Sequence, residues 1–140
     1  MSDNELDLAE ERLKNFIIEM NQCEKLYGKE FVRNNKTITD DMDKNMRRDL
    51  ADIFNRHCTK KERKYGRINN ITISIPPTYG INEKIIKKEI EKNKITLYTI
   101  GDKPLNCEYR YTLRKKAGSW LIDRKEMYDD YDQKWINDIL

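Results

Sequence analysis

The chain has 140 residues, of which 38% are charged and 37% hydrophobic, yet its formal net charge is only +3. Disordered chains combine low hydrophobicity with high net charge, so the near cancellation of charge and the 8 Tyr, 3 Phe and 2 Trp indicate a folded chain. The length suits one domain over residues 1–140. No window approaches the roughly 18 consecutive apolar residues of a membrane-spanning helix, so we expect no membrane partner.

The first part of the sequence has the periodicity of two amphipathic helices. Ser2 and Glu5 have the spacing of a capping box, and apolar residues then recur every three or four positions to about Gly28. A second helix is predicted to begin near Thr39 or Asp40. Its apolar stripe consists of Met46, Leu50, Ile53, Phe54, His57 and Cys58.

From residue 68 onward the hydrophobic period changes to two, which is typical of half-buried strands. Strands are predicted over 71–75 and 95–100, and a weaker alternation over 86–90 leaves strand and helix both open. Residues 109–114 and 120–123 are predicted to form a hairpin.

The end of the chain has a different spacing. Apolar and aromatic residues recur at helical intervals, which predicts a short terminal helix; they are Tyr128, Tyr131 or Asp132, Trp135 and Ile139. Helices followed by an antiparallel meander of four or five strands predict an α+β fold, with one curved sheet and helices on one face.

The sequence contains no recognisable catalytic or metal-binding group. His57 is the only histidine, and its place on the apolar stripe favours a packed structural residue over a general base. One histidine and three scattered cysteines do not suit a zinc site. The serines and glycines match neither a nucleophile elbow nor a phosphate-binding loop. We therefore expect no catalytic residues, no metal and no cofactor.

The three cysteines and the N-terminus bear on the compartment. An odd number of widely spaced cysteines does not suit a disulfide framework, so reduced thiols are expected. The N-terminus is acidic, whereas a signal peptide begins with basic residues followed by an apolar run. Both observations favour the cytoplasm.

Charge is distributed unevenly along the chain. Residues 1–24 carry a net charge of −5 and residues 123–140 carry −3, which leaves +11 between them. The densest basic run extends from Lys60 to Arg67. Nucleic-acid binding needs several phosphate contacts and stacking aromatics, and cations also suit the end of a helix, so nucleic acid is not the expected partner.

Adjacent carboxylates occur twice. The first pair, Asp40 and Asp41, is explained by the start of the predicted second helix, where negative charge is favourable. The second pair, Asp129 and Asp130, lies among tyrosines and has no capping role. It is either a solvated turn or a binding rim that combines aromatic and acidic side chains.

Several segments resemble one known family. They are residues 16–21, residues 58–67, the Ile-Pro-Pro-Thr-Tyr run at 75–79, and the stretch from Tyr109 through Trp120 to Trp135. Together they resemble the bacterial immunity proteins with a nuclear-transport-factor-2-like fold. These proteins protect cells that make rearrangement-hotspot (Rhs) and related polymorphic toxins. The resemblance covers about residues 9–136.

The resemblance implies a cone, in which two or three N-terminal helices pack on a curved antiparallel sheet around a concave cavity. It implies a non-enzymatic cytoplasmic protein that neutralises a cognate toxin domain by direct stoichiometric contact. A homo-oligomer is compatible with this function. The same fold also occurs in isomerases and cyclases, so an enzyme that binds a small molecule in the cavity is the alternative.

We expect the contacts with the toxin on loops and at one end of the sheet. Tyr79 follows the Pro-Pro break and is expected on a loop. The other expected contacts are Tyr128, Asp129, Asp130, Tyr131 and Trp135. Tyr128 and Trp135 have an alternative place in the core of the cone.

Overall fold

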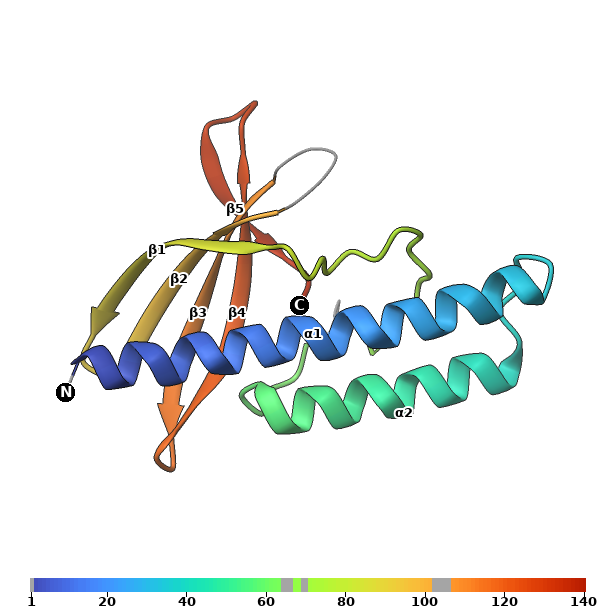
Figure 1. Cartoon of the computed structure of the whole chain (residues 1–140), viewed down its shortest axis with the longest axis horizontal. Coiled ribbons are helices and arrows are strands. Elements are labelled where there is room, and N and C mark those ends of the chain that lie inside the picture. The colour runs from blue at the N-terminus through green and yellow to red at the C-terminus, as the bar shows by residue number, and fades with distance from the viewer. Residues whose placement is uncertain (1, 64–66, 69–70, 102–106) are drawn as a thin grey trace.

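The computed structural model describes residues 2–63, 67–68, 71–101 and 107–140. Within these residues, two helices are followed by five strands (Figure 1). The elements are α1 (Ser2–Arg33), α2 (Asp40–His57), β1 (Lys84–Glu91), β2 (Lys94–Ile100), β3 (Glu108–Lys116), β4 (Ser119–Asp129) and β5 (Lys134–Asp138). The expected α+β class, with helices first and an antiparallel sheet second, is confirmed.

The two helices begin and end for identifiable local reasons. α1 continues past the expected end near Gly28 to Arg33 and stops before Asn35 and Lys36, which both have the positive φ that ends helices. α2 begins as expected, because the Thr39 hydroxyl oxygen accepts a hydrogen bond from the Met42 N–H at 3.1 Å.

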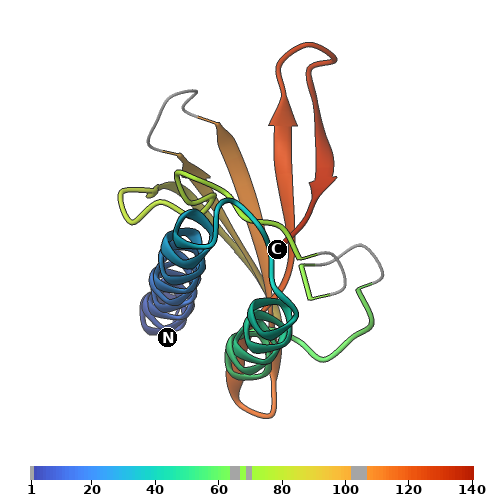
Figure 2. The same ribbon diagram turned by 90° about the vertical axis from the view of Figure 1, so that its right-hand side faces the viewer.

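The five strands form one open sheet in the order β1-β2-β3-β4-β5, and every neighbouring pair is antiparallel. α1 crosses the sheet and contacts β1, β2 and β4, while α2 packs beside α1 (Figure 2). The helices and one face of the sheet enclose the core, whose fully buried members include Leu13, Phe16, Met20, Leu97, Leu113 and Ile122. The opposite face of β2, β3 and β4 is not covered by these helices.

Two of the expected strand and helix assignments need correction, and one open assignment is resolved. Residues 86–90 lie within β1, so the weak alternation belongs to a strand. The strand expected over 71–75 is wrong: this segment is irregular and pairs with no strand. Its alternating isoleucines arise because Ile71 and Ile73 pack against the core while Ile75 is 61% exposed.

The terminal helix expected around Trp135 is also wrong, because residues 134–138 form β5 and pair with β4. Tyr128 and Trp135 are direct cross-strand partners on either side of a turn. The two residues are seven positions apart, which is about two turns of a helix and therefore suggested a helix. In the structure the same separation belongs to two residues that face each other across a hairpin.

A buried carboxylate on α1 holds the irregular segment that precedes β1. Glu24 is 4% exposed, and its two carboxylate oxygens accept hydrogen bonds from the N–H groups of Thr78 and Tyr79, both at 2.9 Å. The Asn21 amide donates to the Tyr79 carbonyl at 2.6 Å. These bonds place the Tyr79 ring under the sheet, where it is completely buried.

The concave side of the sheet around Tyr79 is filled by side chains. The Lys125 side chain is 1% exposed and lies between aromatic rings, with its Nζ 4.4 Å from the Tyr79 centroid and 4.2 Å from that of Tyr109. Asp138 of β5 is its ionic partner, at 3.4 Å. Burial lowers the pKa of Lys125, and the Asp138 carboxylate opposes that effect. At this position the expected cavity is occupied by the protein itself.

Replacing Glu24 by Ala would remove both acceptors of the Thr78 and Tyr79 N–H groups. We expect the free energy of unfolding to fall by about 2–3 kcal/mol, because an unpaired buried donor costs about 1–3 kcal/mol. Urea denaturation measures the change. Glu11→Ala, at an exposed position of the same helix, is the control and should change stability by less than about 0.5 kcal/mol. Equal stability of the two variants would contradict the role of Glu24.

Candidate functional site

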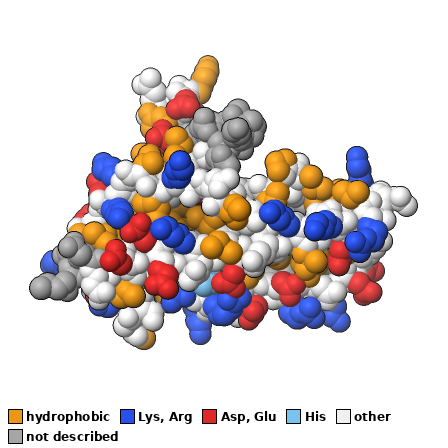
Figure 3. All heavy atoms as spheres, viewed as in Figure 1, with side chains coloured by type: hydrophobic (Ala, Val, Ile, Leu, Met, Phe, Trp, Pro, Cys, Tyr) orange, Lys and Arg blue, Asp and Glu red, His pale blue; other side chains and the backbone are white. Residues whose placement is uncertain are grey.

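The hairpin of β4 and β5 projects beyond the rest of the sheet (Figures 1 and 2). Its strands pair from Lys125 and Asp138 at the base to Asp129 and Lys134 at the end of the ladder. Hydrophobic and acidic side chains cover this projection in the space-filling view (Figure 3). The hairpin is therefore an aromatic and acidic protrusion. A mixed surface of this kind was expected from the sequence, but with these residues in a terminal helix.

The turn at the tip presents one aromatic side chain to solvent. The Asp129 carboxylate accepts hydrogen bonds from the N–H groups of Tyr131 at 3.0 Å and Asp132 at 3.4 Å, which is an Asx-type turn. Gln133 closes the turn with a φ of 53°. Tyr131 is 94% exposed, so its ring makes almost no contact with the chain.

Below the tip, three aromatic rings and an arginine form a cluster on the sheet face opposite the helices. The Trp135 ring packs edge-on against Tyr128, with centroids 5.3 Å apart, and against Tyr98 at 5.7 Å. The Arg110 guanidinium lies 4.6 Å from the Trp135 centroid. We call Tyr98, Arg110, Tyr128 and Trp135 the aromatic face. All four are half-buried, so part of each remains open to a partner.

An ion pair fixes the aromatic face in position. Arg110 donates two hydrogen bonds to the Glu126 carboxylate, at 2.8 and 3.0 Å, and Arg124 contacts the same carboxylate at 3.1 Å. The Arg110 hydrogen bonds lower the pKa of Glu126, which is 6% exposed. Because the guanidinium is held by this carboxylate, its plane stays over the Trp135 ring.

This arrangement is suited to binding a protein. Trp, Tyr and Arg are the residues most enriched among interface hot spots, and rings that are already packed lose little conformational freedom on binding. The tip adds Asp130 and Asp132, which are both exposed. A partner that contacts the hairpin therefore meets rigid aromatic surface with carboxylates at one end.

The structure brings five of the six expected contact residues together on this hairpin. Tyr128 and Trp135 lie on the aromatic face, and Asp130 and Tyr131 lie at the tip. Asp129 shapes the turn. Tyr79 is the exception: it lies on a loop as expected, but it is completely buried in the core and cannot meet a partner on this surface.

Sequence reasoning missed Tyr98 and Arg110, which complete the aromatic face. The two residues are cross-strand partners in β2 and β3, and Arg110 is in turn opposite Glu126 in β4. The alternation within each strand places them on the polar face. Their proximity to Trp135 depends on the register and on β5, which the sequence did not reveal.

His57, the one histidine, has both ring nitrogens occupied. Nε2 contacts the Glu19 carboxylate, and Nδ1 lies 3.1 Å from a guanidinium nitrogen of Arg12. The ring is also edge-on to Phe16. This is the geometry of a structural histidine that links α2 to α1, and it leaves no nitrogen for a substrate.

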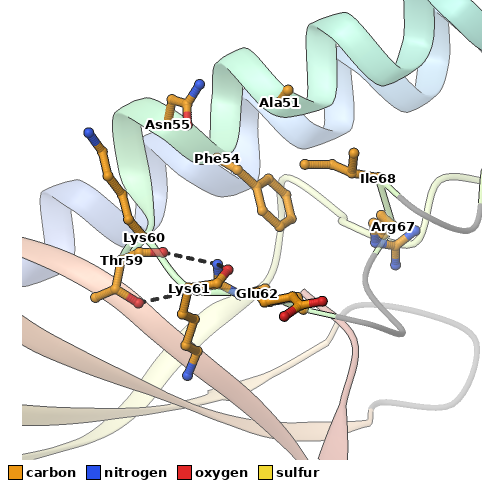
Figure 4. Close-up of a pocket in the computed structure, with 10 residues that line it drawn as sticks. Ala51, Phe54, Asn55, Thr59, Lys60, Lys61, Glu62, Arg67 and Ile68 are labelled. Carbon is orange, nitrogen blue, oxygen red and sulfur yellow. Dashed lines mark hydrogen bonds between the residues drawn. The ribbon is translucent and has the colours of Figure 1, made fainter.

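The basic run at the end of α2 lines a pocket of about 420 Å³ next to Phe54 (Figure 4). Two of the cations that line it make internal contacts. Arg63 donates to the Thr59 carbonyl at 2.9 Å and to the Asp123 carbonyl at 3.3 Å, and Lys61 lies 3.3 Å from the Asp123 carboxylate. Residues 64–66 of the run lie outside the described residues.

The described residues contain no group of three or more His, Cys, Asp or Glu side chains that could hold a metal. The three cysteines are unpaired, and burial raises the pKa of Cys23 and of Cys58 to about 12. Neither buried thiol is a reactive nucleophile. None of the described helices is long and apolar enough to cross a membrane.

Replacing Arg110 by Ala should lower the free energy of unfolding by about 1–2 kcal/mol near neutral pH, because Glu126 loses two charged hydrogen bonds but keeps Arg124. The pKa of Glu126 is lower in the folded chain than its ordinary value of 4.5. The stabilisation of the fold by ionised Glu126 is therefore complete above pH 4.5 and is lost as the pH falls through the lower pKa of the folded chain.

The difference between wild type and Arg110→Ala should consequently shrink when urea unfolding is repeated between about pH 7 and about pH 3. Lys116→Ala, at an exposed position of the same strand, is the control. A stability difference that stays constant with pH would contradict the assignment of the pKa shift to Arg110.

Comparison with known proteins agrees with the fold. The family described as NTF2 fold immunity protein matches residues 8–139. Immunity protein RhsIA of Dickeya dadantii (strain 3937) is 41% identical over 132 residues, which cover 94% of this chain and 96% of that protein. No solved structure matches the chain significantly. This chain thus belongs to the family of NTF2 fold immunity proteins, a non-enzymatic family.

Proposed function

We propose that this immunity protein binds a cognate Rhs-type toxin domain in a one-to-one complex and neutralises it by direct contact through the β4–β5 hairpin. The observation that carries the proposal is the position of Tyr131, an aromatic side chain that is 94% exposed at the tip of an ordered projection. An aromatic ring with almost no intramolecular contact adds little to the stability of the fold, whereas rings of this type anchor interfaces.

The choice of toxin class comes from the relative. A protein 41% identical over nearly its whole length is named immunity protein RhsIA. That name supports an Rhs-type toxin as the partner of this chain as well. Since the cognate toxin would act inside the producing cell, we place the complex in the cytoplasm.

The hairpin tip is too small to form the whole interface with the toxin. A stable interface buries about 800 Å² on each partner, which is more than one turn can supply. The aromatic face extends this surface from the tip down the sheet. Its side chains are held by their packing around Trp135 and by the ion pair between Arg110 and Glu126. We therefore propose that the toxin contacts both the tip and the aromatic face.

The other partner classes have less support. Three of the four described cations of the basic run contact protein groups; they are Lys61, Arg63 and Arg67. Binding of nucleic acid needs several phosphate contacts, so the described part of this run is poorly suited to it. The cone alternative, an isomerase or cyclase, would need an open cavity, and Lys125 with its surrounding tyrosines occupies that place. A homo-oligomer is compatible with the same exposed sheet face.

Tyr131→Ala tests the proposal with little risk to the fold. We expect the dissociation constant for the toxin domain encoded beside this gene to rise at least about tenfold, the effect of removing an aromatic anchor. Isothermal titration calorimetry measures it. Survival of cells that co-express toxin and variant should fall in parallel.

The matched control is Ile86→Ala on β1, at the opposite edge of the sheet. Ile86 is 54% exposed, and its loss should leave affinity and survival unchanged. The hairpin would be excluded if Tyr131→Ala bound as tightly as this control. Failure of the wild-type chain to bind the toxin at all would reject the proposed function itself.

A further inference from the structure

A second surface, far from the hairpin in the fold, has the character of a docking site. It is a groove of about 700 Å³ between the C-terminal third of α1 and the irregular segment before β1. Gly28 and Val32 supply one wall, and Ile75 and Pro77 supply the other. Val32 is 55% exposed and Ile75 is 61% exposed, so the groove is apolar and open.

One edge of this groove carries a row of cations. Lys25, Lys29 and Arg33 are spaced by four residues along α1 and all line the groove. Figure 3 shows hydrophobic side chains gathered above this half of α1, with lysine and arginine side chains along the helix beneath them. We call the groove with these three cations the basic-edged groove.

These cations have no ionic partner among the residues that the structure describes, whereas three exposed or half-buried carboxylates of α1 do. Glu5 is bound by Lys115, Glu10 by Lys88 and Glu19 by Arg56. Glu24 also lines the groove, but its carboxylate is 4% exposed and already accepts two backbone hydrogen bonds. It is therefore not available to neutralise the row.

The helix dipole explains only part of the row. It favours cations in the last turn of a helix, where Arg33 lies. Lys25 lies two turns earlier, beyond the range of that effect. Three unpaired cations beside exposed apolar side chains are complementary to a segment that carries carboxylates along one side of an apolar ridge.

From this complementarity we propose that the basic-edged groove binds an acidic amphipathic segment of the toxin, so that the toxin contacts the immunity protein at two separate surfaces. The inference rests on the proposed function for the identity of the partner. Apolar side chains of the segment enter the groove beside Val32 and Ile75. Its carboxylates meet Lys25, Lys29 and Arg33.

The apolar contact is tested with Val32→Glu and its matched control Leu8→Glu. Both positions are on α1, and the two side chains are 55% and 47% exposed. We expect Val32→Glu to raise the dissociation constant for the toxin domain encoded beside the gene at least about tenfold, whereas Leu8→Glu leaves it unchanged. Urea unfolding of both variants shows whether the fold is retained.

The ionic contact is tested with the combined variant Lys25→Gln, Lys29→Gln and Arg33→Gln, with Lys14→Gln as the control. Screening by salt weakens interactions between charges. We therefore expect the affinity of the combined variant for the same toxin domain to depend less steeply on salt concentration than that of wild type. Lys14→Gln should keep the wild-type dependence.

Crosslinking identifies the segment directly. A photoreactive benzoylphenylalanine at position 32 should form a crosslink with the toxin, and mass spectrometry should locate it in a segment with several Asp or Glu residues. A crosslink to a neutral or basic segment would overturn the proposal. Unchanged toxin binding by Val32→Glu would also overturn it. If Tyr131→Ala nevertheless lost affinity for the toxin, the proposed function would stand and only the role of the groove would be rejected.

Light scattering tests whether the groove instead binds a second copy of this chain. If Val32→Glu abolished a dimer of the wild-type chain and left the affinity for toxin unchanged, the groove would belong to a second copy of this chain and the proposal would be overturned. Failure of the wild-type chain to bind toxin would remove both the proposed function and this inference.

Discussion

The two hydrogen bonds that the Glu24 carboxylate accepts from Thr78 and Tyr79 hold the segment that fills the cone and lines the basic-edged groove. A segment without secondary structure has no ladder partners for its own N–H groups, so a side-chain acceptor helps to hold it against the helix. Held there, it buries Tyr79 beneath the sheet and leaves Ile75 exposed on the groove. One carboxylate thus contributes both to the filling of the cone and to the shape of the basic-edged groove.

A second buried charge connects the filled cone to the hairpin. Lys125 of β4 lies against Tyr79 on the concave side and forms an ion pair with Asp138 of β5. The next residue, Glu126, points to the opposite face and holds Arg110 over Trp135. Neighbouring residues of one strand therefore fix the interior and the aromatic face, since successive strand side chains alternate between the two faces.

Local patterns were sufficient to predict the class of fold, both helices and the hairpin around Trp120, because periodicity and capping are local properties. They failed at 71–75, a segment that leads to the residues that Glu24 holds against α1, and around Trp135, where pairing with β4 replaces a helix. The candidate site was predicted in part: Tyr128 and Tyr131 are neighbours in sequence, whereas Tyr98 and Arg110 join them only through strand register.

The contact between the first helix and β4 has a consequence for synthesis of the protein. Arg12 donates to the Trp120 carbonyl, 108 residues away, and the Trp120 indole donates to Glu5. While the ribosome makes the intervening chain, the apolar stripe of α1 has no sheet to cover it, and exposed surface of this kind promotes aggregation. The apolar stripe of α1 can therefore be covered by the whole sheet only after most of the chain has been synthesised.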